Sequence, residues 1–200
     1  MSKQLDDKDI IDIENQEDKG KKGEKGNSFL TTLWDWGKSF IIALVIALLI
    51  KAVIFEPTQV LGQSMENTLF TGDRVIVNKL TLRFNPIKRK DIIVMHYKPT
   101  KEDYIKRVIG LPGETVQLID GSFYINGDKI EENYIKGDRT EANNGFEWKL
   151  GQDEYFVAGD NRLPGKSKDS RAFGPVKLDD ILGVASFRFY PLGDSFGKLK

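Results

Sequence analysis

The sequence predicts a mainly β protein, with a single N-terminal transmembrane helix followed by an antiparallel β-sheet domain that carries a small β excursion. One long apolar run, residues 40–55, lies between charged segments. After it, short β-branched runs bounded by turn residues recur towards the C-terminus. No long amphipathic helical pattern follows the apolar run. With 200 residues, the chain is long enough to form a core without disulfides.

Composition excludes several kinds of site. The chain contains 30 Lys and Arg, 30 Asp and Glu, no cysteine and one histidine, His96. Balanced charge argues against a general nucleic-acid binder, which needs a basic surface. A cysteine nucleophile and zinc sites built from several Cys and His are excluded. If the chain is an enzyme, its base is therefore expected to be His96, a carboxylate or a lysine.

The N-terminal segment is predicted to be a disordered tail, residues 1–33. Its first 26 residues hold eight acidic side chains and six lysines, with few bulky apolar side chains. Such a composition buries too little apolar surface to offset the entropy lost on ordering.

The apolar run and the six residues before it are predicted to form an uncleaved membrane anchor, residues 34–55. As a helix its 22 residues span about 33 Å, against a hydrocarbon core of about 30 Å. Trp34 and Trp36 stand where an interfacial aromatic belt is expected. The run is followed by bulky or charged residues rather than a small-residue cleavage pattern. A buried globular helix is the less favoured alternative, because few core helices are apolar on every side.

The flanking charges predict the orientation of this anchor. Lysines at 19, 21, 22, 25 and 38 precede it, whereas residues 56–73 contain no Lys or Arg. The positive-inside rule then places the N-terminus in the cytoplasm. We therefore expect a single-pass protein of the cell membrane, with residues 56–200 as its extracytoplasmic domain.

Six strands are predicted in the outer domain from β-branched runs and alternation. They are residues 73–79, 91–97, 115–120, 122–125, 155–158 and 181–190. Asn126-Gly127 is a strong two-residue hairpin signal. The polar stretch from 131 to 152 predicts that about 115–152 form an inserted β subdomain rather than part of the main core.

Three segments contain residues suited to catalysis. Ser64 follows Gly62 on a turn between two extended stretches, although serines in turns are usually turn formers. Alternation along the chain places Lys106 on the same face of an extended segment as Tyr104 and Val108. If Lys106 is buried there, its pKa is lowered and the neutral amine can act as a base for a serine. If it is not buried, its side chain extends to water. Residues 159–176 concentrate Asp, Arg and Ser, as in a buried polar network or a solvated loop.

In order and spacing these segments resemble the bacterial type I signal peptidases, Ser/Lys-dyad membrane endopeptidases, in their short Gram-positive form. The resemblance covers about residues 38–190. After the anchor come SMENTL at 64–69, where the family has SMxPTL, and then the strand GDRVIVNK. YIKRVIGLPGE and GDNR…SxDSRxxGxV follow in the family order. The resemblance implies removal of signal peptides from exported pre-proteins, without a metal or other cofactor.

The resemblance assigns roles to individual residues. Ser64 matches the nucleophile and supplies one oxyanion donor through its N–H, Lys106 matches the general base, and Ser167 matches the serine that orients the lysine. A supporting network is implied for Asp160, Arg107, Asp169, Ser170 and Arg171. Two strands are implied to flank the substrate: Thr58, Gln59, Val60, Leu61 and Gly62 on one side, and Asp103, Tyr104 and Ile105 on the other. His96 belongs to no motif and is expected to be structural or exposed.

Two departures and two alternatives accompany the resemblance. Asn67 stands where the family usually has proline, and two extra residues precede Ser167. A self-cleaving Ser/Lys regulatory peptidase is disfavoured by the predicted anchor, and a catalytically inactive membrane scaffold stays open. The partners expected are signal peptides of secretory pre-proteins, the lipid bilayer and a nearby secretion translocon, with no nucleic acid.

Overall fold

The computed structural model describes residues 27–142, 146–193 and 195–199. The disordered tail predicted for residues 1–26 lies outside these ranges. By its contacts the chain divides into two compact units, Met1–Ile50 and Lys51–Lys200, which are described separately below.

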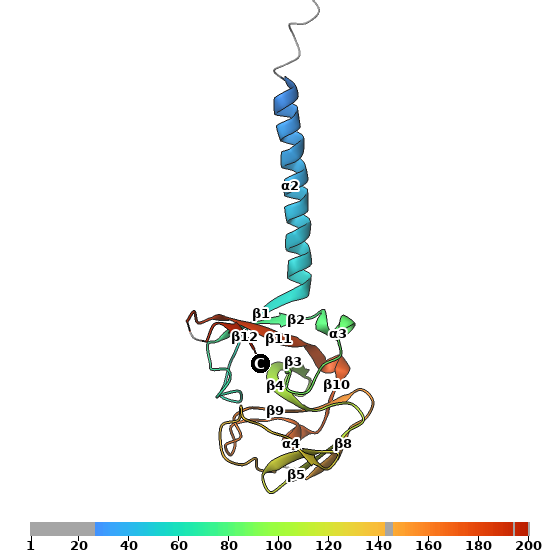
Figure 1. The fold of residues 1–200 in the computed structure, drawn as a ribbon, viewed down its shortest axis with the longest axis vertical. Helices are drawn as coiled ribbons and strands as arrows, with labels where there is room; N and C mark the ends of the chain where they lie inside the picture. The colour runs from blue at the N-terminus through green and yellow to red at the C-terminus, as the bar shows by residue number, and fades with distance from the viewer. Residues whose placement is uncertain (1–26, 143–145, 194, 200) are drawn as a thin grey trace, which may run out of the picture. The chain divides into compact units, whose positions relative to one another are not determined.

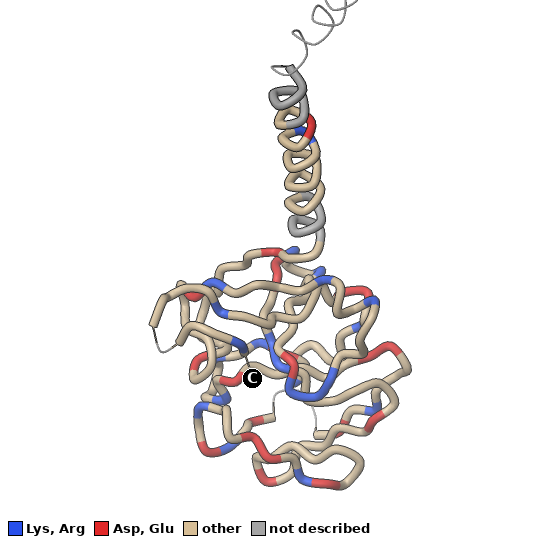
Figure 2. The backbone as a smooth tube through the Cα atoms, turned by 45° about the horizontal axis from the view of Figure 1, so that its top comes forward, with Lys and Arg blue, Asp and Glu red and all other residues tan. Residues whose placement is uncertain are grey.

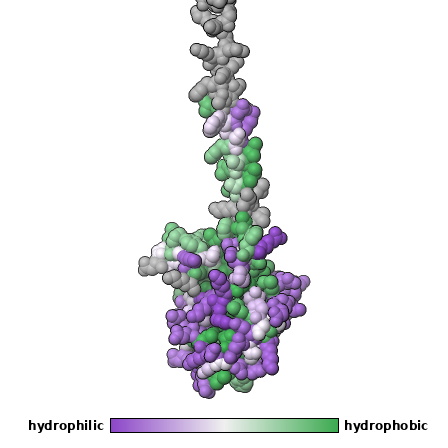
Figure 3. Space-filling view, turned by 45° about the vertical axis from the view of Figure 1, so that its right-hand side comes forward, coloured by the Kyte–Doolittle hydropathy of each residue, from purple (hydrophilic) through white to green (hydrophobic). Residues whose placement is uncertain are grey.

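A long helix, α2 (Asn27–Ile54), contains most of the predicted anchor. It begins seven residues before Trp34, so residues 27–33 were wrongly included in the predicted tail. No proline or glycine interrupts residues 27–36, which explains the earlier start. Figure 3 shows apolar side chains around its described middle. Among the stretches whose side chains are described, no helix is long and apolar enough to cross a membrane.

The main sheet of the second unit has eight strands in the order β1-β2-β11-β3-β4-β9-β10, with β12 paired to β11 (Figure 1). All of its strand pairs are antiparallel. The strands predicted at 73–79, 91–97, 155–158 and 181–190 are confirmed as β2, β3, β9 and β11. The bounds are β1 (Phe55–Gln59), β2 (Arg74–Asn78), β3 (Ile92–Tyr97), β4 (Glu102–Gly110), β9 (Glu154–Ala158), β10 (Val176–Lys177), β11 (Ile181–Tyr190) and β12 (Gly197–Lys198).

A second sheet has four antiparallel strands in the order β7-β6-β5-β8. They are β5 (Thr115–Ile119), β6 (Ser122–Ile125), β7 (Asp128–Lys129) and β8 (Glu147–Lys149). The Asn126-Gly127 hairpin is confirmed, because Ile125 pairs directly with Asp128. In Figure 1, β5 and β8 lie below β9, towards the lower end of this unit. The described helices of the second unit are short: α3 (Thr81–Phe84), α4 (Ser170–Phe173) and η1 (Leu178–Asp180).

Strand β9 joins the two sheets through its alternating side chains. Val157 packs in the core of the main sheet with Ile93 and Val108. Its neighbour Phe156 points to the other face and packs with Phe123 and the rest of the second sheet's core. A third cluster, between β2, β3 and the segment after β1, contains Met65 and Leu69. Residues on both sides of the Ser64 turn are therefore tied to the core.

Candidate active site

The Ser64 turn is held by buried neighbours and by a specific backbone conformation. Met65 and Leu69 are buried, and the Leu69 N–H donates to the Met65 carbonyl at 2.9 Å. The Ser64 carbonyl accepts a hydrogen bond from the Asn161 N–H at 3.0 Å. Gly62 has φ +85°, a conformation in which a side chain would be strained. Ser64 is thus presented on a fixed turn, with glycine required just before it.

The amine of Lys106 lies beside the Ser64 hydroxyl. Its Nζ is 2.8 Å from Ser64 Oγ and 2.9 Å from the Ile105 carbonyl oxygen. Lys106 is only 3% exposed, so its side chain does not extend to water. Burial lowers the pKa of Lys106 to about 8, against the charges of Asp169 and Asp160, which raise it. The neutral amine is therefore accessible near pH 8 and can accept the proton of the hydroxyl.

Ser167 is buried close to this pair, but its hydroxyl donates to Asp169 Oδ2 at 2.7 Å. Within the described chain, the hydrogen-bond acceptors of Lys106 Nζ are Ser64 and Ile105. The role of Ser167 in orienting the lysine stays a prediction. Gly159 allows the close packing here, because a Cβ on it would lie 2.3 Å from both Ser167 Oγ and the Ser64 carbonyl oxygen.

Asp169 and Arg171 form one half of the predicted supporting network. Arg171 donates to the buried carboxylate of Asp169 through Nε at 2.8 Å and Nη2 at 2.7 Å, and the Gly159 N–H donates at 3.0 Å. Burial raises the pKa of Asp169, but these donors and the Arg171 charge outweigh it, so the pKa lies below its ordinary value. Ser170 accepts a hydrogen bond from the Val157 N–H at 2.9 Å. These contacts attach the Ser167 loop to β9.

Arg107 and Asp160 form the other half. Both side chains are fully buried, and Arg107 donates through Nε at 2.9 Å and Nη2 at 2.7 Å. The same carboxylate accepts the hydroxyl of Thr68 at 2.5 Å, four residues after Ser64. A paired and fully hydrogen-bonded buried ion pair is costly to break from one side. The pair therefore connects β4, the Ser64 turn and the loop after β9.

Sequence reasoning missed two residues of the GDNR motif. Arg162 is fully buried; it donates to the Gly159 carbonyl at 2.7 Å and to Thr140 at 2.7 Å, and it pairs with Glu132. Asn161 donates to the Gln63 carbonyl at 3.0 Å. The motif itself was the available signal, but its partners lie far away in sequence.

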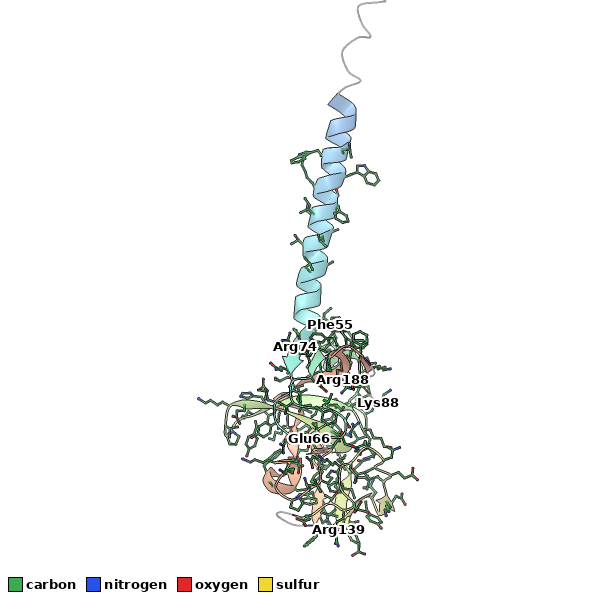
Figure 4. All side chains as sticks on the ribbon, turned by 90° about the vertical axis from the view of Figure 1, so that its left-hand side faces the viewer. Phe55, Glu66, Arg74, Lys88, Arg139 and Arg188 are labelled. Atoms are coloured by element: carbon green, nitrogen blue, oxygen red, sulfur yellow. The ribbon has the colours of Figure 1, made fainter. Side chains whose placement is uncertain are left out.

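A short segment of the excursion, residues 134–136, is fastened to the Ser64 turn and was also missed. Asn67 donates through Nδ2 to the carbonyls of Tyr134 at 2.9 Å and Ile135 at 3.2 Å. Lys136 forms an ion pair with Glu66 at 2.8 Å. Figure 4 shows Glu66 between the end of this unit that carries Phe55 and the end that carries Arg139. Asn67 has φ 102°, which a proline ring does not permit, so its side chain rather than a ring fixes this turn.

A cleft of about 620 Å³ opens beside Ser64 and Lys106. All eight residues predicted to flank the substrate line it. β1 pairs with β2 alone, and β9 pairs with β4 only from Arg107 to Gly110. In the described sheet, β1 and the first half of β4 therefore each have one edge whose backbone groups pair with no other strand, and both strands line the cleft. An extended peptide can add to such edges.

The Ser64 N–H and the side chain of His96 remain to be placed relative to the site. The Ser64 N–H donates to no acceptor within the described chain, so it is available to a developing oxyanion. His96 is half-buried on β3, and its Nδ1 lies 2.8 Å from Asp103 Oδ1. Lys106 is thus the amine that contacts the serine, whereas His96 is half-buried and bonded to Asp103. The expectation that His96 is structural or exposed stays a prediction.

Comparison with known proteins identifies the family. Residues 33–190 match the family described as "Signal peptidase, peptidase S26". The chain belongs to the signal peptidase family, peptidase S26. It is 40% identical over 195 residues to "Signal peptidase I" of Bacillus amyloliquefaciens, with 90% of this chain and 96% of the relative covered. It is 41% identical over 185 residues to "Signal peptidase I T" of Bacillus subtilis (strain 168), with 86% and 90% covered.

The chain is also similar to the solved structure of a signal peptidase I from Enterococcus faecalis V583, with 34% sequence identity and a TM-score of 0.41. The match covers 50% of this chain and 97% of that one. Membership of the signal peptidase family makes the chain a serine endopeptidase that removes signal peptides. The resemblance drawn from the motifs is confirmed by the matched range of the chain.

Proposed function

We propose that this signal peptidase cleaves with Ser64 as nucleophile and Lys106 as general base. The supporting observation is the 2.8 Å contact between the buried Lys106 amine and Ser64 Oγ. The neutral amine takes the hydroxyl proton as Oγ attacks the scissile carbonyl, and the Ser64 N–H stabilises the oxyanion. The resulting ammonium protonates the leaving amine. Lys106 then deprotonates a water that hydrolyses the acyl-enzyme.

The substrate is proposed to bind as an extended strand in the cleft. Residues 58–62 and 103–105 would pair with the chain that precedes the cut, because both edges are unpaired and face the same space. Val60, Met65 and Ile105 make the walls near Ser64 apolar. Small side chains at the first and third positions before the cut suit shallow apolar pockets, as the family resemblance implies.

The location is proposed to be the outer face of the cytoplasmic membrane. The support is the apolar run at 34–55 and the lysines before it, which by the positive-inside rule leave the N-terminus in the cytoplasm. A substrate whose signal helix lies in the same bilayer would meet the site in two dimensions. The bilayer and a nearby secretion translocon are the partners this implies, and nucleic acid is not among them.

Processing of a pre-protein by the full chain, Ser64→Ala and Lys106→Ala tests the proposal. Both variants should lose cleavage while retaining the wild-type unfolding midpoint within a few degrees. His96→Gln is the control, and it should process at nearly the wild-type rate. Undiminished processing by Ser64→Ala would contradict the proposal.

The same assay separates the alternatives. An inactive scaffold would not process the pre-protein even as wild type. A self-cleaving regulator would shorten its own chain and leave the pre-protein intact.

A further inference from the structure

The loop between β9 and α4 places two lysines at the cleft. Lys166 and Lys168 line it, although the sequence analysis assigned them no role. Between them Ser167 is buried and bonded to Asp169, whereas both lysines are exposed. Because side chains alternate along an extended segment, fixing Ser167 inward directs its two neighbours outward.

Neither ammonium group has a carboxylate partner within the described chain. Lys166 donates to the neutral amide of Gln63 at 3.2 Å. The amine of Lys168 lies over the ring of Tyr97, 4.8 Å from its centroid. Other described cations, among them Lys79, Lys98 and Lys136, are in ion pairs, and Figure 2 shows both charge types spread over the unit. Both charges are therefore available to a bound chain.

The acidic residues of the cleft are at a different place. Glu102 and Asp103 begin β4, and Asp103 is already paired with His96. Glu102 precedes Lys106 by four residues, or about 13 Å of strand. Lys168 lies at the same end as these acidic residues, because its amine is over the ring of Tyr97, which pairs with Glu102. The basic region beside Ser64 is therefore Lys166 alone.

The position of Lys166 relates the basic region to the direction of the substrate. Residues 58–62 lead along one wall towards Ser64, and Lys166 contacts Gln63, the residue adjoining Ser64. A chain that pairs with residues 58–62 before the cut reaches Lys166 only as it passes Ser64. The basic region thus meets the residues that follow the cut.

We propose that Lys166 selects substrates with an acidic side chain at the first or second residue after the cleavage site. This inference rests on the proposed function, since it concerns the far side of the same cut. An exposed ion pair of this kind changes a rate constant by about twofold to fivefold, and salt screens it.

Three pre-proteins that differ only in those two residues, Glu-Glu, Gln-Gln or Lys-Lys, provide the test. With the full wild-type chain, kcat/KM should be about twofold to fivefold higher for Glu-Glu than for Gln-Gln, and lowest for Lys-Lys. The Glu-Glu to Gln-Gln ratio should fall to about one in Lys166→Gln and should stay at the wild-type value in Lys168→Gln. It should invert in Lys166→Glu. Because the ratio is taken within one variant, it does not depend on how much of that variant folds.

Lys129→Gln/Lys177→Gln is the matched control, since both lysines are exposed and neither lines the cleft. It should keep the wild-type ratio, and high salt should reduce that ratio. A ratio of one in the wild type, or a ratio that is unchanged in Lys166→Gln, would overturn this inference while cleavage of the Gln-Gln substrate still depended on Ser64. Cleavage that did not depend on Ser64 would instead overturn the proposed function.

Discussion

The pKa of the Lys106 amine is lowered by burial and raised by two nearby carboxylates. Burial lowers the pKa to about 8, and the nearby carboxylates of Asp169 and Asp160 prevent a larger fall. Each carboxylate is itself in an ion pair, Asp169 with Arg171 and Asp160 with Arg107. In the proposed mechanism the supporting network therefore sets the pKa of Lys106 and takes no part in proton transfer.

Gly159 is the residue at which a single methyl group should matter most. In Gly159→Ala the new Cβ would overlap the Ser64 carbonyl and Ser167 Oγ, so the Ser64 turn must shift. We expect kcat/KM for pre-protein cleavage to fall by about 100-fold or more, as misplacement by an ångström does elsewhere. Gly151→Ala is the control, because its new methyl group meets only the flexible end of Glu154. Equal activity in the two variants would show that the turn tolerates the displacement.

At the scale of elements, the second sheet and its connections support the nucleophile from a distance. Residues 134–136 bond to the Ser64 turn, and the Lys136 N–H donates to the Asp160 carbonyl at 2.8 Å. Arg162 ties the loop after β9 to Glu132 and Thr140 in the same excursion. The excursion is therefore part of the framework that orients Ser64.

Substitutions at Asn67 separate the two contributions of that residue. Asn67→Ala loses the bonds to Tyr134 and Ile135 and keeps a strained φ of 102°, so it should lower the free energy of unfolding by about 2–4 kcal/mol. Asn67→Gly loses the same bonds but relieves the strain, and it should lie between wild type and Asn67→Ala. Urea unfolding measures both differences. If Asn67→Gly were the less stable variant, backbone strain would not be important at this position.

At the scale of the whole molecule, most strands and the Ser64–Lys106 pair could be predicted, because β-branched runs, the Asn126-Gly127 turn and the ordered motifs are local signals. Strands β8, β10 and β12 could not, because each is short and forms only against a partner from elsewhere in the chain. The contacts of Asn67 and Arg162 were missed for the same reason, since their partners are 67 and 30 residues away. The start of α2 was misplaced because polar residues can extend a helix that an apolar run begins.

Burial of the Lys106 ammonium should lower the free energy of unfolding, relative to a chain with an apolar side chain at this position. The pKa of Lys106 falls from 10.5 to about 8 on folding. At pH 7 the lysine is protonated in both states, and holding the buried ammonium costs up to about 3 kcal/mol. The penalty is full below pH 8 and disappears as pH rises towards 10.5. Lys106→Met should therefore be inactive yet more stable at pH 7, as thermal unfolding would show by a higher midpoint. A lower midpoint would mean that the ammonium is well solvated.

The pH dependence of kcat/KM for pre-protein cleavage tests most directly whether Lys106 acts as the base. With a pKa of about 8, activity should rise about tenfold per pH unit on the acid side, reach half its maximum near pH 8 and then level off. The profile of His96→Gln should superimpose on that of the wild type. A half-maximum near pH 6.5 that disappears in His96→Gln would contradict the account, because a histidine would then be the base.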